Sequence, residues 1–132
     1  MKAIEIINET ANFYKADVNR RALLSKSYCA YNTEDGRHCA VGRCFRKIYK
    51  DKGLGLPFND DSMVDLLSHY GYKSIDVLLM PRYRGHDFEL WKDLQLFHDS
   101  GENWDDKGLT EQGEETLSNL REKWGDENLE NN

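Results

Sequence analysis

Apolar residues recur along this chain at helical spacing, in short stretches bounded by glycine or by capping residues. Steps of three and four residues place one apolar stripe on an expected helix at 3–14, formed by Ile4, Ile7, Ala11 and Tyr14. The same spacing predicts four further helices, at about 40–50, 63–70, 88–98 and 111–124. Asp87 and Thr110 are placed to cap the last two. The pattern predicts a predominantly helical protein with about five helices.

Residues 27–40 break the helical pattern and predict a β-hairpin. Two short runs of aromatic or small residues, 27–32 and 37–40, flank the pair Asp35-Gly36. Glycine accepts the positive φ that a tight hairpin turn requires. The expected fold class is therefore α+β, predominantly helical, with one hairpin near 27–40. Residues 74–80 fit either a short helix or a buried strand.

Length and composition indicate one domain. The chain has 132 residues, of which 39% are apolar, enough for a core without disulfides or metal. We expect a single globular domain at 1–125 and an acidic, disordered tail at 126–132. No stretch approaches the roughly 18 apolar residues of a membrane span, and the first residues do not have the pattern of a signal peptide. Three cysteines favour reduced thiols, and we expect a cytoplasmic protein without a membrane partner.

Charge is divided unevenly along the chain, although the net charge is −6. Residues 15–52 carry ten Lys and Arg against four Asp and Glu, whereas residues 86–132 carry four against fourteen. This division suggests one half that faces anions and one acidic half. The alternative is attraction between the two halves, or between two copies of the chain, so a homo-oligomer stays open.

Two basic features are the best candidates for a binding site. The polar face of the expected helix at 40–50 carries Arg43, Arg46, Lys47 and Lys50. A turn carries Arg82, Tyr83 and Arg84, and guanidinium groups beside an aromatic ring suit a phosphate and a stacked base. An anionic, nucleotide-like small molecule or a host protein is the expected partner, and the net charge argues against duplex DNA. The alternative is a solvated helix face and a charged turn.

The cysteines do not follow a zinc pattern. Cys29, His38, Cys39 and Cys44 contain no Cys-x-x-Cys pair, and small buried thiols explain them best. Two alternatives remain: a cysteine enzyme that uses Cys39 with His38, and a zinc-stabilised interaction module. No phosphate-binding glycine motif and no catalytic signature occurs, so we expect no cofactor and no bound metal, and a binding protein is favoured over an enzyme.

Two segments resemble a family of small bacteriophage and prophage accessory proteins whose activity is uncharacterised. YCAYNTEDGRHCAVGRC, at 28–44, is similar to a pattern of Cys-x-Tyr, a glycine turn and Cys-Ala-Val-Gly-Arg. WKDLQLFHDSGENWDDKGLTEQG, at 91–113, is similar to a pattern that joins Trp-x-Asp-Leu-Gln and His-Asp to Gly-Leu-Thr-x-x-Gly. The resemblance implies a protein of the host cytoplasm with a counter-defence role. Such a protein would sequester a nucleotide messenger or block a host protein, and the resemblance assigns no catalytic residue.

Overall fold

The computed structural model describes residues 1–21, 23–25, 28–29, 37, 39–47 and 75–125. Within these residues lie the helices α1 (Ala3–Ala16), α4 (Ile75–Leu78), α5 (Phe88–Asp99) and α6 (Glu111–Gly125), and the 3-10 turns η1 (Val18–Arg20), η2 (Gly42–Cys44) and η5 (Pro81–Tyr83). Two antiparallel hairpins join β1 (Leu23–Ser25) to β2 (Tyr28–Cys29) and β3 (Trp104–Asp105) to β4 (Gly108–Leu109). The expected α+β, predominantly helical class is confirmed. The expected helix at 63–70, the turn at Asp35-Gly36 and the tail at 126–132 lie outside the described residues.

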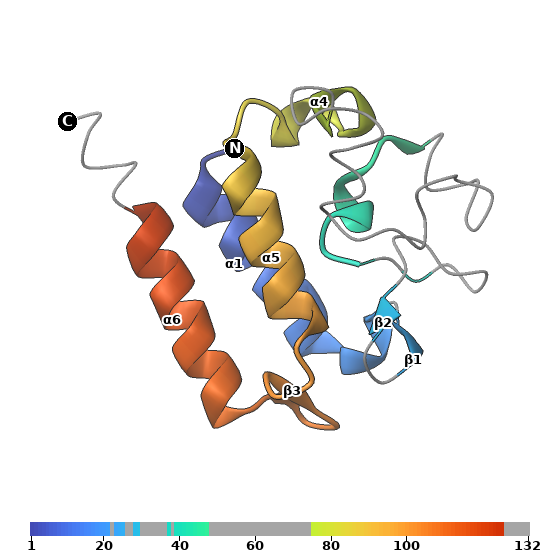
Figure 1. Cartoon of the computed structure of the whole chain (residues 1–132), viewed down its shortest axis with the longest axis vertical. Helices are drawn as coiled ribbons and strands as arrows, with labels where there is room; N and C mark the ends of the chain where they lie inside the picture. The colour runs from blue at the N-terminus through green and yellow to red at the C-terminus, as the bar shows by residue number, and fades with distance from the viewer. Residues whose placement is uncertain (22, 26–27, 30–36, 38, 48–74, 126–132) are drawn as a thin grey trace.

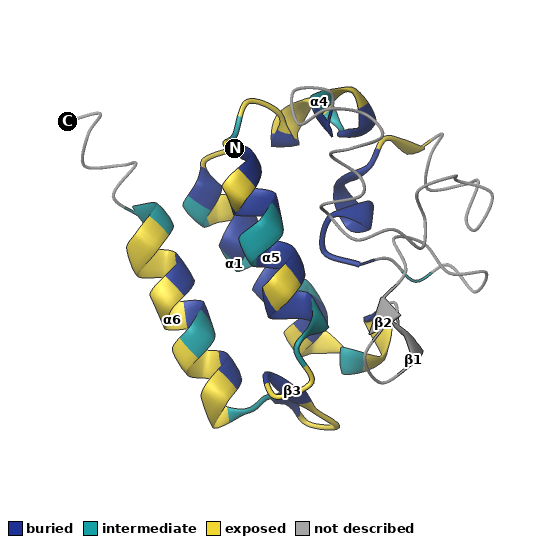
Figure 2. Ribbon diagram, in the orientation of Figure 1, coloured by how far each residue is buried: buried dark blue, intermediate teal, exposed yellow. Residues whose placement is uncertain are grey.

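Three long helices lie side by side and form the body of the fold (Figure 1). Helix α6 runs opposite to α1, and an ion pair between Lys15 and Glu114 joins the end of α1 to the beginning of α6. The faces that the three helices turn toward one another are buried, and their outer faces are exposed (Figure 2). The largest fully buried side chains are aromatic: Trp91, Tyr14, Tyr83, Phe45 and Phe97. Among the described residues, no helix has the length and apolar character needed to cross a membrane.

Capping residues set the beginnings of α5 and α6 where the sequence predicts them. The Asp87 carboxylate accepts a hydrogen bond from the backbone N–H of Glu89, 2.8 Å away. The Thr110 hydroxyl accepts one from the N–H of Gly113, 3.0 Å away. Each cap satisfies a backbone donor that has no partner within the helix. The predicted helices at 88–98 and 111–124 are confirmed to within one residue at each end.

The hairpin of β1 and β2 lies earlier in the chain than predicted. Tyr28 and Cys29 do form a strand, but the strand pairs with 23–25. Cys39 and Ala40, which the prediction places in the second strand, instead lead into the 3-10 turn η2. The Asp35-Gly36 signal is local, whereas strand pairing depends on which segment the tertiary structure brings alongside.

The helix predicted at 40–50 does not form over 40–46. The 3-10 turn η2 ends at Cys44, and the backbone of the next residue, Phe45, is extended at φ −66° and ψ 152°. Phe45 forms an antiparallel bridge with Leu79: the Arg46 N–H donates to the Leu78 carbonyl at 2.7 Å, and the Met80 N–H donates to the Cys44 carbonyl at 2.9 Å. The predicted burial of Val41, Cys44 and Phe45 is nevertheless correct. Tertiary hydrogen bonds have here replaced the helical ones that the spacing predicts.

A second hairpin, β3 with β4, lies between the expected helices at 88–98 and 111–124. Trp104 anchors it, because its ring packs against Phe97 at 5.2 Å between centroids and its indole N–H donates to the Phe97 carbonyl at 2.9 Å. Gly108 closes the turn at φ +128°, a conformation that favours glycine. Each strand has only two residues, too few for an alternating pattern to be visible in the sequence.

Gly113 should be irreplaceable for a steric reason. An added Cβ there would lie 2.2 Å from the Asn103 carbonyl oxygen and 2.7 Å from a methyl of Leu109. We expect Gly113→Ala to lower the free energy of unfolding by about 2–3 kcal/mol, because backbone must move to relieve the clash. Gly101→Ala is the control, since its added Cβ meets nothing within 4 Å. Chemical denaturation measures both, and an equal effect of the two substitutions would contradict this account.

Candidate functional site

A buried arginine joins three segments that are distant in sequence. The Arg43 side chain, from η2, is 9% exposed and makes an ion pair with Glu9 of α1, with 2.7 Å between Nη1 and Oε1. Its Nη2 donates to the Thr10 hydroxyl at 2.8 Å. The Tyr83 hydroxyl, from η5, lies 3.5 Å from Nη1 and donates to the same Glu9 oxygen at 2.5 Å. Two donors therefore converge on one carboxylate oxygen.

Hydrogen bonds keep Glu9 and Arg43 of this cluster charged at neutral pH. Burial opposes the charge on Glu9, but the hydrogen bonds from Tyr83 and Arg43 outweigh it and hold the pKa of Glu9 below its ordinary value. Burial raises the pKa of Tyr83, and its bond to Glu9 adds to this effect, so the phenol keeps its proton and donates. The buried charge of Arg43 is thus compensated by the carboxylate of Glu9, which is partly exposed.

Two exposed arginines, Arg82 and Arg84, lie close to Tyr83 in the sequence and are held in place by hydrogen bonds. Arg82 donates from Nη2 to the Tyr83 hydroxyl at 2.8 Å, and its guanidinium lies over the Tyr83 ring at 4.7 Å. Arg84 donates from Nε to the Leu79 carbonyl at 3.0 Å. Leu79 is also the residue that bridges to Phe45. One short backbone ladder therefore positions residues from both predicted basic features.

The predicted binding residues divide into three groups. Arg43 and Tyr83 are buried in the Glu9 cluster, so Tyr83 has no exposed ring face on which a base could stack. Arg46, Lys47, Arg82 and Arg84 are exposed. Lys50 lies outside the described residues. The single helical face expected for the first basic feature is not formed, because the chain becomes extended at Phe45.

Glu9 and Thr10 are the residues of this cluster that the sequence did not single out. Thr10 lies three residues after Ile7 and four before Tyr14, so helical spacing puts it on the apolar face of α1. A buried hydroxyl needs a partner. Thr10, a polar residue on an otherwise apolar stripe, was the available signal.

The environment of Cys39 is opposite to that of a reactive thiol. Burial raises the pKa of Cys39 to about 12, and its sulfur accepts a hydrogen bond from the Gly42 N–H at 3.3 Å. Cys44 is also buried, and its thiol lies 3.6 Å from the Ala40 carbonyl. The sequence suggests that a helix N-terminus and Arg43 would lower the pKa of Cys39, but burial has the larger effect. His38 lies outside the described residues.

A second buried polar group is centred on His98 of α5. Its Nδ1 lies 2.8 Å from Asp99 Oδ1, which also accepts a hydrogen bond from Gln95 at 2.7 Å. Its ring meets Tyr14 edge-on at 4.9 Å, as expected for a core histidine. Burial lowers the pKa of His98, against the effect of Asp99. The His98 side chain is fully buried, so its imidazole has no access to a substrate, although Asp99 is partly exposed.

Comparison with models of protein families, with curated proteins and with solved structures finds no match to this chain. In the part of the chain that the structure covers, no three His, Cys, Asp or Glu side chains are arranged to hold a metal ion. Function must therefore be argued from the geometry of the chain itself.

Removing the Glu9 charge should expose the cost of burying Arg43. We expect Glu9→Gln to lower the free energy of unfolding at pH 7 by about 2–3 kcal/mol, somewhat less than a fully buried broken pair, because glutamine still accepts one hydrogen bond. The pKa of Glu9 is lower in the folded state, so its contribution is present above pH 4.5 and lost as the pH falls through the folded pKa. The difference between the two proteins should therefore shrink in acid. Glu122→Gln, at an exposed position, is the control for denaturation curves measured from pH 7 to pH 3.

The buried thiols should react only after unfolding. We expect iodoacetamide at pH 7.5 to leave Cys39 and Cys44 unmodified in the native protein and to modify both in denaturant, because neither sulfur is exposed. Peptide-resolved mass spectrometry reads each cysteine separately. Selective alkylation of native Cys39 would revive the cysteine-enzyme hypothesis.

Proposed function

We propose that this chain is a non-enzymatic binding protein that holds an anionic ligand on a basic ridge, defined as Arg46, Lys47, Arg82 and Arg84. The observation that carries the proposal is the anchoring of Arg84. Its Nε is bonded to the Leu79 carbonyl, while its two Nη groups make no hydrogen bond to any of the described residues. The guanidinium is thereby held with its outer edge available to a phosphate or a carboxylate.

Anchoring matters because a free arginine loses side-chain entropy when it binds. Ordering such a side chain costs up to about 2 kcal/mol, a cost that Arg84 and Arg82 have met in part on folding. The exposed side chains of Arg46 and Lys47 extend the ridge, since the bridge between Phe45 and Leu79 sets their backbone beside α4. Exposed cations at 46–47, 82 and 84 suit a ligand with several negative charges.

Recognition in this proposal is by charge and not by stacking, because Tyr83 is buried. The ligand class is a phosphate-bearing small molecule such as a nucleotide, or an acidic surface of a host protein. The biological setting comes from the resemblance of 28–44 and 91–113 to phage and prophage accessory proteins. In that setting the protein acts in the host cytoplasm and counters defence by sequestering a nucleotide messenger or by blocking a host protein.

The test is charge reversal on the ridge, with ATP and inorganic pyrophosphate as probes in isothermal titration calorimetry. We expect the double substitution Lys47→Glu and Arg84→Glu to abolish binding while the melting temperature stays nearly unchanged, since both side chains are exposed. Arg84→Lys should weaken binding about tenfold, because lysine keeps the charge but not the planar fork.

Lys107→Glu is the matched control, as an exposed charge reversal on the distant β3–β4 turn. If it weakens binding as much as the ridge substitutions do, the effect is one of net charge only. If neither probe binds the wild-type protein, an acidic protein surface remains the ligand class, and native mass spectrometry of the protein purified from bacterial lysate then decides.

A further inference from the structure

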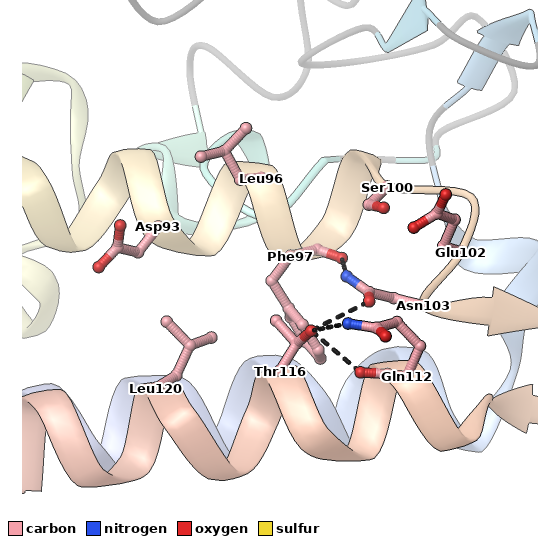
Figure 3. Close-up of a pocket in the computed structure, with 9 residues that line it drawn as sticks. All are labelled: Asp93, Leu96, Phe97, Ser100, Glu102, Asn103, Gln112, Thr116 and Leu120. Carbon is pink, nitrogen blue, oxygen red and sulfur yellow. Dashed lines mark hydrogen bonds between the residues drawn. The ribbon is translucent and has the colours of Figure 1, made fainter.

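An open groove between α5 and α6 lies apart from the basic ridge, and it was not anticipated from the sequence. Its volume is about 330 Å³ (Figure 3). Its lining combines apolar side chains with carboxylate, amide and hydroxyl groups: Asp93, Leu96, Phe97, Ser100, Glu102, Asn103, Gln112, Thr116 and Leu120. Phe97 and Leu120 are almost fully buried, whereas Leu96 is 66% exposed and is the apolar lining residue that a partner can reach.

The lining residues show that the groove is about two helical turns long. On α6 it is lined at positions 112, 116 and 120, which are successive turns of one face. On α5 it is lined from Asp93 to Ser100, also two turns. At 1.5 Å per residue each wall is about 11–12 Å long. A groove of this length matches two turns of a third helix that presents side chains at i, i+4 and i+7.

A carboxylate lies at each end of the groove, Asp93 at one end and Glu102 at the other (Figure 3). The Thr116 hydroxyl donates a hydrogen bond to Asn103 Oδ1, 3.2 Å away. Asp93 accepts from Lys123 at 2.8 Å and from the Trp124 indole at 3.0 Å, so its charge is already compensated. The exposed Glu102 carboxylate, at the other end, makes no bond to the described residues. A partner therefore finds an uncompensated negative charge at the Glu102 end.

The surroundings strengthen this charge preference. Residues 86–125, which contain both walls, carry eleven Asp and Glu against four Lys and Arg. An acidic partner would be repelled, whereas a cationic one would be attracted. The apolar lining requires that the partner also present an apolar face.

We propose that this groove docks a cationic amphipathic helix of a partner protein, with an apolar side chain against the exposed Leu96 and a basic side chain beside Glu102. The proposal does not rest on the basic ridge, because the two surfaces share no residue. A protein that carries both surfaces could engage an anionic ligand and a basic helix independently.

The test uses fluorescein-labelled helical peptides of 15 residues in an anisotropy titration at 150 mM salt. One peptide carries leucine at i, i+3, i+4 and i+7 with lysine elsewhere, and its companion has the same composition in an order without an apolar face. We expect the amphipathic peptide to bind the wild-type protein at least tenfold more tightly. Failure to bind, or equal binding of the two peptides, overturns the proposal.

Two pairs of substitutions locate the binding. Glu102→Lys and Gln112→Lys place positive charge in the groove and should each weaken binding about tenfold. Asp106→Lys and Asn119→Lys make the same charge changes at exposed positions outside it and should leave binding within about twofold. Equal loss in both pairs overturns the proposal in favour of attraction to net charge, and thermal denaturation checks that all four variants are folded.

Discussion

The guanidinium of Arg43 has to be compensated inside the fold, because a buried charge without partners costs several kcal/mol. Glu9 and Thr10 supply the partners from α1, and Tyr83 supplies a hydroxyl from η5. Meeting this requirement fixes how η2 and η5 lie against the first helix. The bridge of Phe45 to Leu79 then follows, since it connects the residues next to each of these turns.

The basic ridge depends on the same arrangement. Arg82 is anchored on Tyr83, and Arg84 is anchored on Leu79, so the exposed cations are positioned by the buried one. The predicted binding residues thus have two kinds of role. The buried residues Arg43 and Tyr83 organise the site, and in the proposed function the anchored guanidinium of Arg84 meets the ligand. A substitution at Glu9 should disturb both.

The packing of α5 against α6 depends on a close backbone approach and not on a buried charge. Helix α6 joins α5 through the short β3–β4 hairpin, and Gly113 allows the first turn of α6 to approach Asn103 closely. This approach leaves a groove along the two helices. Exposed arginines thus lie at and after η5, at Arg82 and Arg84, whereas the groove between α5 and α6 is lined by the carboxylates of Asp93 and Glu102.

The sequence by itself determined α1, α5 and α6, because their stripes, caps and end signals are local and agree with one another. It also determined that Val41, Cys44 and Phe45 are buried. Only the tertiary structure decided that this segment is extended at Phe45, that Tyr28 and Cys29 pair with 23–25, and that burial raises the pKa of Cys39. Each of these features depends on residues that are distant in sequence, and the spacing of residues along one segment carries no information about such contacts.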